Sequence, residues 1–297
     1  MAHKMQEFIL WSNCTNRCDF CWQCKMHDIS TILTTEEMVA SIFQAYHKIK
    51  YEINDGDDVL LVGGEILNSY SQATDEAIKM LIDTCVSLVK ENKIRYLYIN
   101  TNLIYENRTN LDYLLKSFNG IEDRLKFTTS YDVYGRFNHS SNKEKSSAFL
   151  SWFSNMLYIR NNYPNINIVV NVIITKQLIE KAKTNDWITD WNMFQTNLGI
   201  KYINFIPYIP VEDDRSMDVT FKDIVKVLAA EEKRKPGYIN FYINDFDNNQ
   251  DKILYEYHKD KGYVECTAKY SECHHNENFK KVLGDECYIC KLKEVFR

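Results

Sequence analysis

The chain has 297 residues, of which 45% are hydrophobic and 26% charged, with nine glycines, four prolines and a net charge of -5. This composition excludes disordered and fibrous proteins, and the length fits one large α/β domain or such a domain with an appendage. The acidic balance argues against a nucleic acid partner, although a small nucleotide substrate is not excluded. No apolar segment suits a signal peptide or a membrane span, so we expect a cytoplasmic protein without a membrane partner.

Strand-like apolar runs alternate with helical patterns along the chain. Strands are expected at 8–11, 59–62, 96–99, 125–130, 166–174 and 202–206, and helices at 34–50, 72–92, 111–118, 147–161, 178–196 and 221–235. Six successive β-α units predict an α/β fold with a parallel sheet, curved into a partial (β/α)6 barrel.

The chain divides, by its composition, after residue 236. We expect residues 1–236 to form the barrel and residues 237–297 a small cysteine-rich C-terminal extension. Within the extension, 238–243 predicts a further strand and 251–259 a short helix. Residues 135–146 are polar and predict a loop, and Thr34 or Thr35 is expected to cap the first helix.

Three cysteines, Cys14, Cys18 and Cys21, follow the first predicted strand with the spacing C-x3-C-x2-C. A loop this short lets three sulfurs converge on an iron–sulfur cluster or a soft metal ion. Because a four-iron cluster normally takes four thiolates, three cysteines leave one iron open. The alternative is a structural zinc site, which uses four protein ligands. Cys24 could be that fourth ligand, but we expect it to be a neighbouring thiol.

The cysteine motif, with Phe20 before its last cysteine, resembles the signature of the radical S-adenosylmethionine (radical SAM) superfamily. The segment Gly63-Gly64-Glu65, directly after the second predicted strand, is similar to the Gly-Gly-Glu motif of the same family. By itself, an adjacent pair of glycines would predict only a turn.

The resemblance implies a 4Fe-4S cluster held by the three cysteines and S-adenosylmethionine (SAM) bound at the open iron. It further implies that SAM is cleaved reductively to a 5′-deoxyadenosyl radical, which takes a hydrogen atom from a substrate. The electron donor would be a protein such as flavodoxin or ferredoxin. The SAM-binding residues that the resemblance implies are Phe20, Gly63, Gly64, Glu65, Asn102, Ser130, Asn171 and Pro207. The candidates on the substrate side are Tyr131 and Asp132 as acid–base groups, with Arg136 and Tyr208.

A second group of cysteines lies in the extension. Its members are Cys266, Cys273, Cys287 and Cys290, with His274 and His275 beside the second. Such a set can hold an auxiliary iron–sulfur cluster, such as a second 4Fe-4S cluster, or a tetrahedral zinc ion. Cys85, by contrast, lies on the apolar face of the second predicted helix and is expected in the core.

The C-terminal cysteines resemble the SPASM and twitch tails of radical SAM enzymes that modify peptides. By this analogy we expect the substrate to be a peptide or protein side chain, and the alternative is a nucleotide or small metabolite. A hypothesis of another class is a non-catalytic zinc-binding module with zinc at both ends.

Overall fold

The structure is a computed structural model of the whole chain. It describes residues 4–16, 18, 21, 32–132, 136–137, 142–183, 197–200, 203–207, 239–241, 255–258 and 263–266. Side chains are described for these residues except 142–146, 181–183, 205–207 and those after residue 238. The chain divides into two units, which are described separately below.

The first unit, residues 1–129 and 135–169, contains a parallel sheet. Its strands, paired in chain order, are β1 (Met5–Ile9), β2 (Asp57–Val62), β3 (Ile94–Asn100) and β4 (Leu125–Tyr131). Leu61, Ile99 and Phe127 lie opposite one another in the register and are buried. Because the strands are parallel, the loops after β1, β2 and β3 meet at one edge of the sheet.

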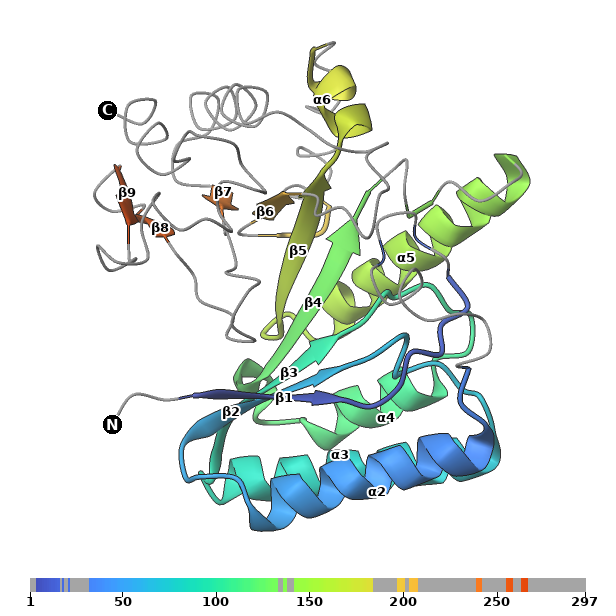
Figure 1. Ribbon diagram of the computed structural model, residues 1–297, viewed down its shortest axis with the longest axis vertical. Coiled ribbons are helices and arrows are strands. Elements are labelled where there is room, and N and C mark those ends of the chain that lie inside the picture. Colours follow the sequence, from blue (N-terminus) through green and yellow to red (C-terminus); the bar gives the residue numbers. More distant parts are fainter. Residues whose placement is uncertain are drawn as a thin grey trace, which may run out of the picture. The chain divides into compact units, whose positions relative to one another are not determined.

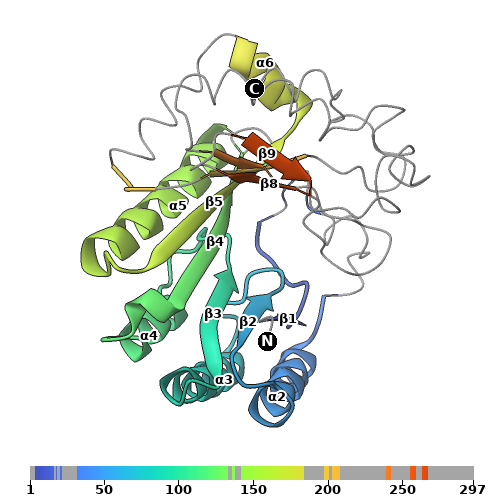
Figure 2. The same cartoon turned by 90° about the vertical axis from the view of Figure 1, so that its left-hand side faces the viewer.

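Helices cover one face of this sheet. They are α2 (Thr35–Tyr51), α3 (Gln72–Lys90), α4 (Thr109–Ser117) and α5 (Asn142–Asn162), and a 3-10 turn (Glu122–Arg124) precedes β4. Figures 1 and 2 show α2, α3 and α4 on the same side of the strands. Their apolar stripes are buried, for example at Ile42 and Ile49 of α2 and at Leu81 of α3. Cys85, also on α3, is fully buried, which confirms its predicted place in the core.

Helix α2 begins with a complete capping box at Thr34. The Thr34 side chain accepts a hydrogen bond from the Glu37 backbone N–H, and the Glu37 carboxylate accepts one from the Thr34 N–H. We expect Thr34→Ala to lower the free energy of unfolding by about 1 kcal/mol, because the Glu37 N–H loses its side-chain hydrogen-bond acceptor. Urea denaturation would measure it. Thr35→Ala, one residue further on, keeps the capping box and is the control; an equal loss in both variants would contradict the role of the cap.

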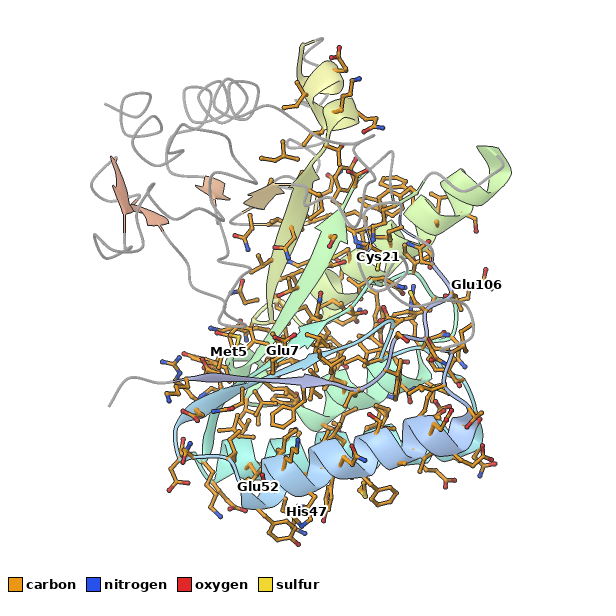
Figure 3. The ribbon with its side chains drawn as sticks, viewed as in Figure 1. Met5, Glu7, Cys21, His47, Glu52 and Glu106 are labelled. Carbon is orange, nitrogen blue, oxygen red and sulfur yellow. The ribbon has the colours of Figure 1, made fainter. Side chains whose placement is uncertain are left out.

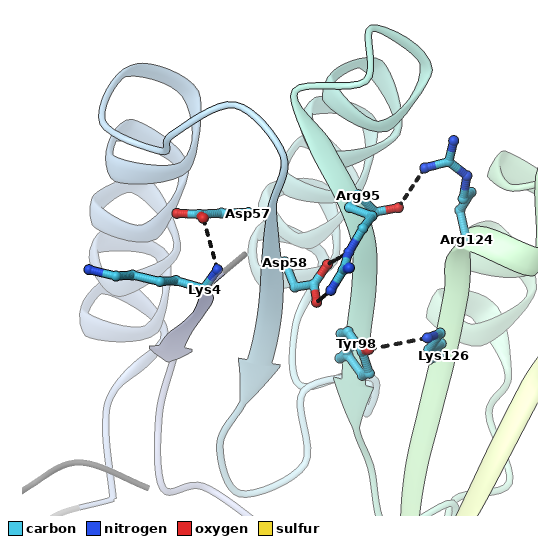
Figure 4. A network of polar contacts seen from close by, with 7 residues as sticks. All are labelled: Lys4, Asp57, Asp58, Arg95, Tyr98, Arg124 and Lys126. Carbon is cyan, nitrogen blue, oxygen red and sulfur yellow. Dashed lines mark hydrogen bonds and ion pairs between the residues drawn. The ribbon is translucent and has the colours of Figure 1, made fainter. Parts of the chain in front are cut away.

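One ion pair and several hydrogen bonds link neighbouring strands, mostly near their amino ends (Figure 4). Arg95 of β3 donates two hydrogen bonds to the Asp58 carboxylate of β2, with Nε and Nη2 at 2.9 and 2.6 Å. Lys126 of β4 donates to the Tyr98 hydroxyl at 3.2 Å, and the Lys4 backbone N–H donates to Asp57 at 3.1 Å. This edge is therefore tied together by polar side chains, and the opposite edge carries the long loops.

The second unit comprises residues 130–134 and 170–297. Its described elements are β5 (Asn167–Ile174), which enters from the first unit, α6 (Lys176–Lys183), β6 (Ile203–Pro207), β7 (Ile239–Phe241), β8 (Tyr255–His258) and β9 (Tyr263–Cys266). Strands β5, β6 and β7 pair in parallel in chain order, whereas β8 and β9 form an antiparallel pair.

The predicted α/β fold with six parallel strands is confirmed, as is the extra strand predicted within 238–243. Two local predictions are wrong. Helix α5 begins at Asn142, inside the predicted loop. The sequence did not indicate this start, because the first turn is polar and lacks the apolar stripe that identifies an amphipathic helix. Residues 255–258 are a strand rather than part of a helix, since their alternating aromatic and polar side chains suit pairing with β9.

Other expectations are not tested by these elements. The helix predicted at 221–235 and residues 184–196 lie outside the described part of the chain. The closure of the sheet into a partial barrel and the boundary after residue 236 stay predictions. Within the described helices, none combines the length and apolar character needed to cross a membrane.

Candidate functional site

The cysteine loop starts where β1 ends, at the edge of the sheet that carries the long loops. Cys14, Cys18 and Cys21 are partly exposed, and none of them forms a disulfide. The Cys21 N–H donates to the Cys18 carbonyl at 3.0 Å, so the backbones of these two residues are in direct contact. Figure 3 shows Cys21 and Glu106, which belongs to the loop after β3, on the same side of Met5 and Glu7 of β1. In the described part of the chain, no three His, Cys, Asp or Glu side chains are grouped to hold a single metal ion.

Polar side chains fix the backbone that leads into this loop. The Asn13 amide exchanges two hydrogen bonds with the Leu33 backbone, at 2.8 and 2.9 Å. The Tyr70 hydroxyl donates to the Asn13 carbonyl at 2.7 Å, and the Trp11 indole N–H donates to the Glu65 carbonyl at 3.4 Å. The residue before Cys14 is therefore held from two directions before the first sulfur is reached.

The glycine pair after β2 packs directly against this lead-in segment. The Gly64 N–H donates to the Trp11 carbonyl at 2.7 Å, and the Glu65 N–H donates to the Asn13 carbonyl at 2.9 Å. A Cβ atom would stand 2.6 Å from the Trp11 carbonyl oxygen at Gly63, and 2.1 Å from the Asn13 carbonyl oxygen at Gly64. Only glycine therefore fits at either position with the backbone where it is.

Glu65 is fully buried and connects the loops after β2 and β3. Its carboxylate accepts hydrogen bonds from the Leu67 N–H at 3.0 Å, the Asn102 N–H at 2.5 Å and the Thr101 hydroxyl at 2.8 Å. Burial raises the pKa of Glu65, and these hydrogen bonds together with the positive charge of Arg136 oppose the rise. The Glu65 carboxylate thus holds the turn that carries Asn102.

We expect Glu65→Gln to destabilise the protein by about 2 kcal/mol, because an amide NH2 group cannot accept the hydrogen bonds that the second carboxylate oxygen accepts. Urea denaturation of both proteins measures the loss. Glu106→Gln is the matched control, since Glu106 is exposed in the loop after the same strand, and it should change the stability by less than about 0.5 kcal/mol. Equal stability of wild type and Glu65→Gln would contradict the anchoring role of this carboxylate.

Two asparagine side chains contact the sulfurs of the loop. The Asn102 amide nitrogen lies 3.3 Å from the Cys14 sulfur, and the Asn16 amide nitrogen lies 3.1 Å from the Cys18 sulfur. Burial raises the pKa of the Cys14 thiol to about 11, and the negative charge of Glu65 adds to this rise. Hydrogen bonds from the Asn16 backbone and the Asn102 side chain, and the charge of Arg136, act in the opposite direction.

A buried cation lies near the same loop. Arg136 is 4% exposed, and its backbone carbonyl accepts a hydrogen bond from the Asn16 amide at 3.4 Å. Its Nε atom is buried without a hydrogen-bond partner among the described residues. The charge of Arg136 opposes the rise in the pKa of both Cys14 and Glu65, so its guanidinium group contributes positive potential to the candidate site.

Within the first unit, the structure places Asn102 against Cys14, the Cys21 N–H against the Cys18 carbonyl, and the Gly63-Gly64-Glu65 segment against residues 11–13. The convergence of the three cysteine sulfurs on one cluster stays a prediction. The residues fit a cluster ligated by cysteine, because two of the thiols already receive N–H donors of the kind found around iron–sulfur clusters. The glycines leave room for the chain's own lead-in segment. Their contact with a ligand stays a prediction.

Five further predicted residues lie in the described part of the second unit: Ser130, Tyr131, Asp132, Asn171 and Pro207. Tyr131 and Asp132 are buried, and Ser130 is half-buried at the end of β4. The Asn171 side-chain oxygen on β5 accepts a hydrogen bond from Asn204 on β6 at 3.0 Å, and Pro207 is the last residue of β6. Their roles in binding SAM or the substrate stay predictions.

Several predicted residues lie outside the described part of the chain: Phe20, Cys24, Tyr208, Cys273, His274, His275, Cys287 and Cys290. Cys266 is the last residue of β9, where only the backbone is described. The sequence interpretation assigned no role to Asn13, Asn16 or Thr101. The sequence did offer one signal for such a role. Asn13 and Asn16 lie close to Cys14 in the chain, and an asparagine amide can donate hydrogen bonds to a neighbouring thiol.

Comparisons with solved structures find distant similarities to this chain. No family model and no curated protein matches this chain. The structure titled "Spore photoproduct lyase C140S mutant" is similar over 92% of this chain and 73% of its own, with a TM-score of 0.40 and 11% sequence identity. The functional assignment therefore depends on this chain's own residues.

Proposed function

We propose that this protein is a radical SAM enzyme whose 4Fe-4S cluster is held by Cys14, Cys18 and Cys21. The observation that carries the proposal is the C-x3-C-x2-C loop after β1, whose lead-in residues 11–13 pack against Gly63-Gly64-Glu65 at the end of β2. When bound and reduced, the cluster would supply one electron to the sulfonium of SAM, so that a carbon–sulfur bond breaks and gives methionine and a 5′-deoxyadenosyl radical that abstracts hydrogen.

The chain's own residues would bind, orient and shield these groups. The three thiols would lose their protons and hold the cluster, and Asn102, fixed by Glu65, would hold the Cys14 side of the site. Phe20, Gly63, Gly64, Ser130, Asn171 and Pro207 complete the proposed SAM-binding set. Tyr131 and Asp132 are the proposed acid–base groups facing the substrate.

The substrate, the second metal and the reductant belong to the same proposal. We favour a peptide or protein side chain as substrate, with a nucleotide or small metabolite as the alternative. Cys266, Cys273, Cys287 and Cys290 would hold an auxiliary 4Fe-4S cluster or zinc. Flavodoxin or ferredoxin would supply the electron, and the proposed location is the cytoplasm.

The test is anaerobic reconstitution with iron and sulfide, followed by incubation with SAM and dithionite. The proposal expects a brown protein that releases 5′-deoxyadenosine and methionine, measured by liquid chromatography. A colourless protein that contains zinc and no iron would refute the proposal and support the zinc-binding module.

Iron counting in a triple variant of Cys14, Cys18 and Cys21 to alanine tests the tail, since residual iron is expected only if the C-terminal cysteines hold a cluster.

A further inference from the structure

The two asparagines that contact the cysteine loop come from different parts of the first unit. Asn16 lies within the loop itself, and Asn102 lies in the turn after β3. Their amide nitrogens are 3.1 Å from the Cys18 sulfur and 3.3 Å from the Cys14 sulfur. They are 4% and 6% exposed, so water has little access to these two contacts. Two of the three thiols therefore face a buried amide donor.

The neighbours of Asn102 fix the direction of its amide. Its side-chain oxygen accepts the Ile104 N–H at 2.6 Å, which leaves the NH2 group to face Cys14. Its backbone N–H is held by the Glu65 carboxylate at 2.5 Å. The orientation of the Asn102 amide toward Cys14 is thus fixed by the Ile104 N–H and the Glu65 carboxylate, and not only by the contact with the sulfur.

The orientation of Asn16 is fixed by a different contact. Its amide nitrogen lies 3.4 Å from the carbonyl oxygen of Arg136 as well as near Cys18. Because a carbonyl oxygen only accepts hydrogen bonds, the group that faces it must be the NH2 group. One amide therefore links the cysteine loop to the backbone of residue 136 and presents a proton to the Cys18 sulfur.

Hydrogen bonds to sulfur are one of the means by which a protein sets the potential of an iron–sulfur cluster. Reduction adds negative charge that is shared with the thiolate sulfurs, and an N–H donor stabilises that charge. Since the donors are buried, water has little access to replace them when they are removed. The reduced state would then lose the stabilisation outright.

We propose that Asn16 and Asn102 are positioning residues that raise the reduction potential of the cluster through N–H···S hydrogen bonds to Cys18 and Cys14. This inference rests on the proposed function, because it requires a cluster on the cysteine loop. It assigns a function to two residues outside the ligand set, and it makes the turn after β3 part of the electron-transfer site.

Three substitutions between uncharged side chains separate the effect of the N–H donors on the reduction potential from the effect of anchoring the loop. Asn16→Leu removes the donor to Cys18 at similar volume. Asn102→Ser removes the donor to Cys14 but keeps an oxygen that can accept the Ile104 N–H. Asn13→Ser is the matched control, since Asn13 is buried next to Cys14 and its side-chain amide forms hydrogen bonds with the Leu33 backbone.

The readout is an EPR-monitored redox titration of the reconstituted proteins. At a fixed solution potential, we expect the ratio of reduced to oxidised cluster to fall by about tenfold in each of Asn16→Leu and Asn102→Ser, which equals about 59 mV for one electron. The double variant should fall by about a hundredfold, because the two donors act on separate sulfurs. Asn13→Ser should stay within about twofold of wild type. Wild-type potentials in both test variants, or an equal shift in the control, would overturn the inference.

A second measurement uses the unaltered protein, so it does not depend on whether a variant folds. In protein labelled with 15N-asparagine, pulsed EPR of the reduced cluster should detect 15N couplings transmitted through the hydrogen bonds to sulfur. A cluster without such couplings overturns this inference and leaves the proposed function standing. A protein that takes up no iron refutes the proposed function, and the inference with it.

Discussion

Cys18→Ala protein, reconstituted without oxygen, is expected to lack the cluster of the N-terminal loop and to release no 5′-deoxyadenosine above a protein-free control. The reason is that the loop would then supply only two of the three thiolates that hold the cluster, since an alanine side chain cannot bind iron. Visible absorption, iron content and chromatography of the SAM cleavage products measure the three consequences.

Two matched controls accompany this variant. Cys85→Ala removes a thiol that is fully buried in α3, where burial raises its pKa to about 12, so it should keep both the cluster and the cleavage activity. Cys24→Ala tests the neighbouring cysteine of the motif, and it too should keep its activity. Loss of SAM cleavage in Cys24→Ala, or its survival in Cys18→Ala, would show that the ligand assignment is wrong.

Gly64→Ala is expected to destabilise the first unit by about 3 kcal/mol or more. The added Cβ would lie 2.1 Å from the Asn13 carbonyl oxygen and 2.5 Å from that of Ser12. Backbone must move to relieve such an overlap. The segment that would move includes Asn13, which holds Leu33 and Tyr70 by hydrogen bonds. The variant should therefore also bind less iron than wild type.

Gly120→Ala is the control for this prediction. Gly120 has a φ of +82°, and nothing lies within 4 Å of a Cβ placed there, so the substitution adds only backbone strain. We expect it to cost about 1 to 2 kcal/mol and to leave iron binding unchanged. Urea denaturation and iron counting compare the two variants. Equal effects of the two substitutions on both measurements would contradict the proposed close packing of the glycine pair against the loop.

Much of the fold follows from local patterns that the sequence displays. The apolar run Val59-Leu60-Leu61-Val62 lies within β2, and the helix predicted from Thr34 begins there with its capping box. Both patterns depend on residues close together in the chain, so they can be read without tertiary contacts. The first turn of α5 was missed, because it lacks the apolar stripe that identified the other helices.

The three cysteines of the candidate site could be selected from the sequence, because they lie close together in the chain, and their role as ligands stays a prediction. The residues around them could not be selected in this way. Asn102 lies 88 positions from Cys14 in the chain, and Arg136 lies 120 positions from Asn16. Nothing in the local pattern of either residue indicates such a contact. The glycines illustrate the same limit. The resemblance implies that they contact SAM, which stays a prediction, but nothing in the sequence indicated their contact with the backbone of residues 11–13.

The buried carboxylate of Glu65 combines a position that the sequence identified with contacts that only the structure shows. Its place in a Gly-Gly-Glu segment was visible in the sequence, but its partners were not. The structure shows that it accepts hydrogen bonds from the turn that carries Asn102, which in turn donates to Cys14. We therefore expect substitutions at Glu65 to affect the cysteine loop through Asn102 rather than by direct contact.

EPR spectroscopy of the wild-type protein, reconstituted and reduced without oxygen, tests the central claim most directly. A cluster bound by Cys14, Cys18 and Cys21 has one iron without a protein ligand, so adding SAM should change its g values. A signal that stays the same with SAM, or a protein that holds zinc and no iron, would contradict the claim.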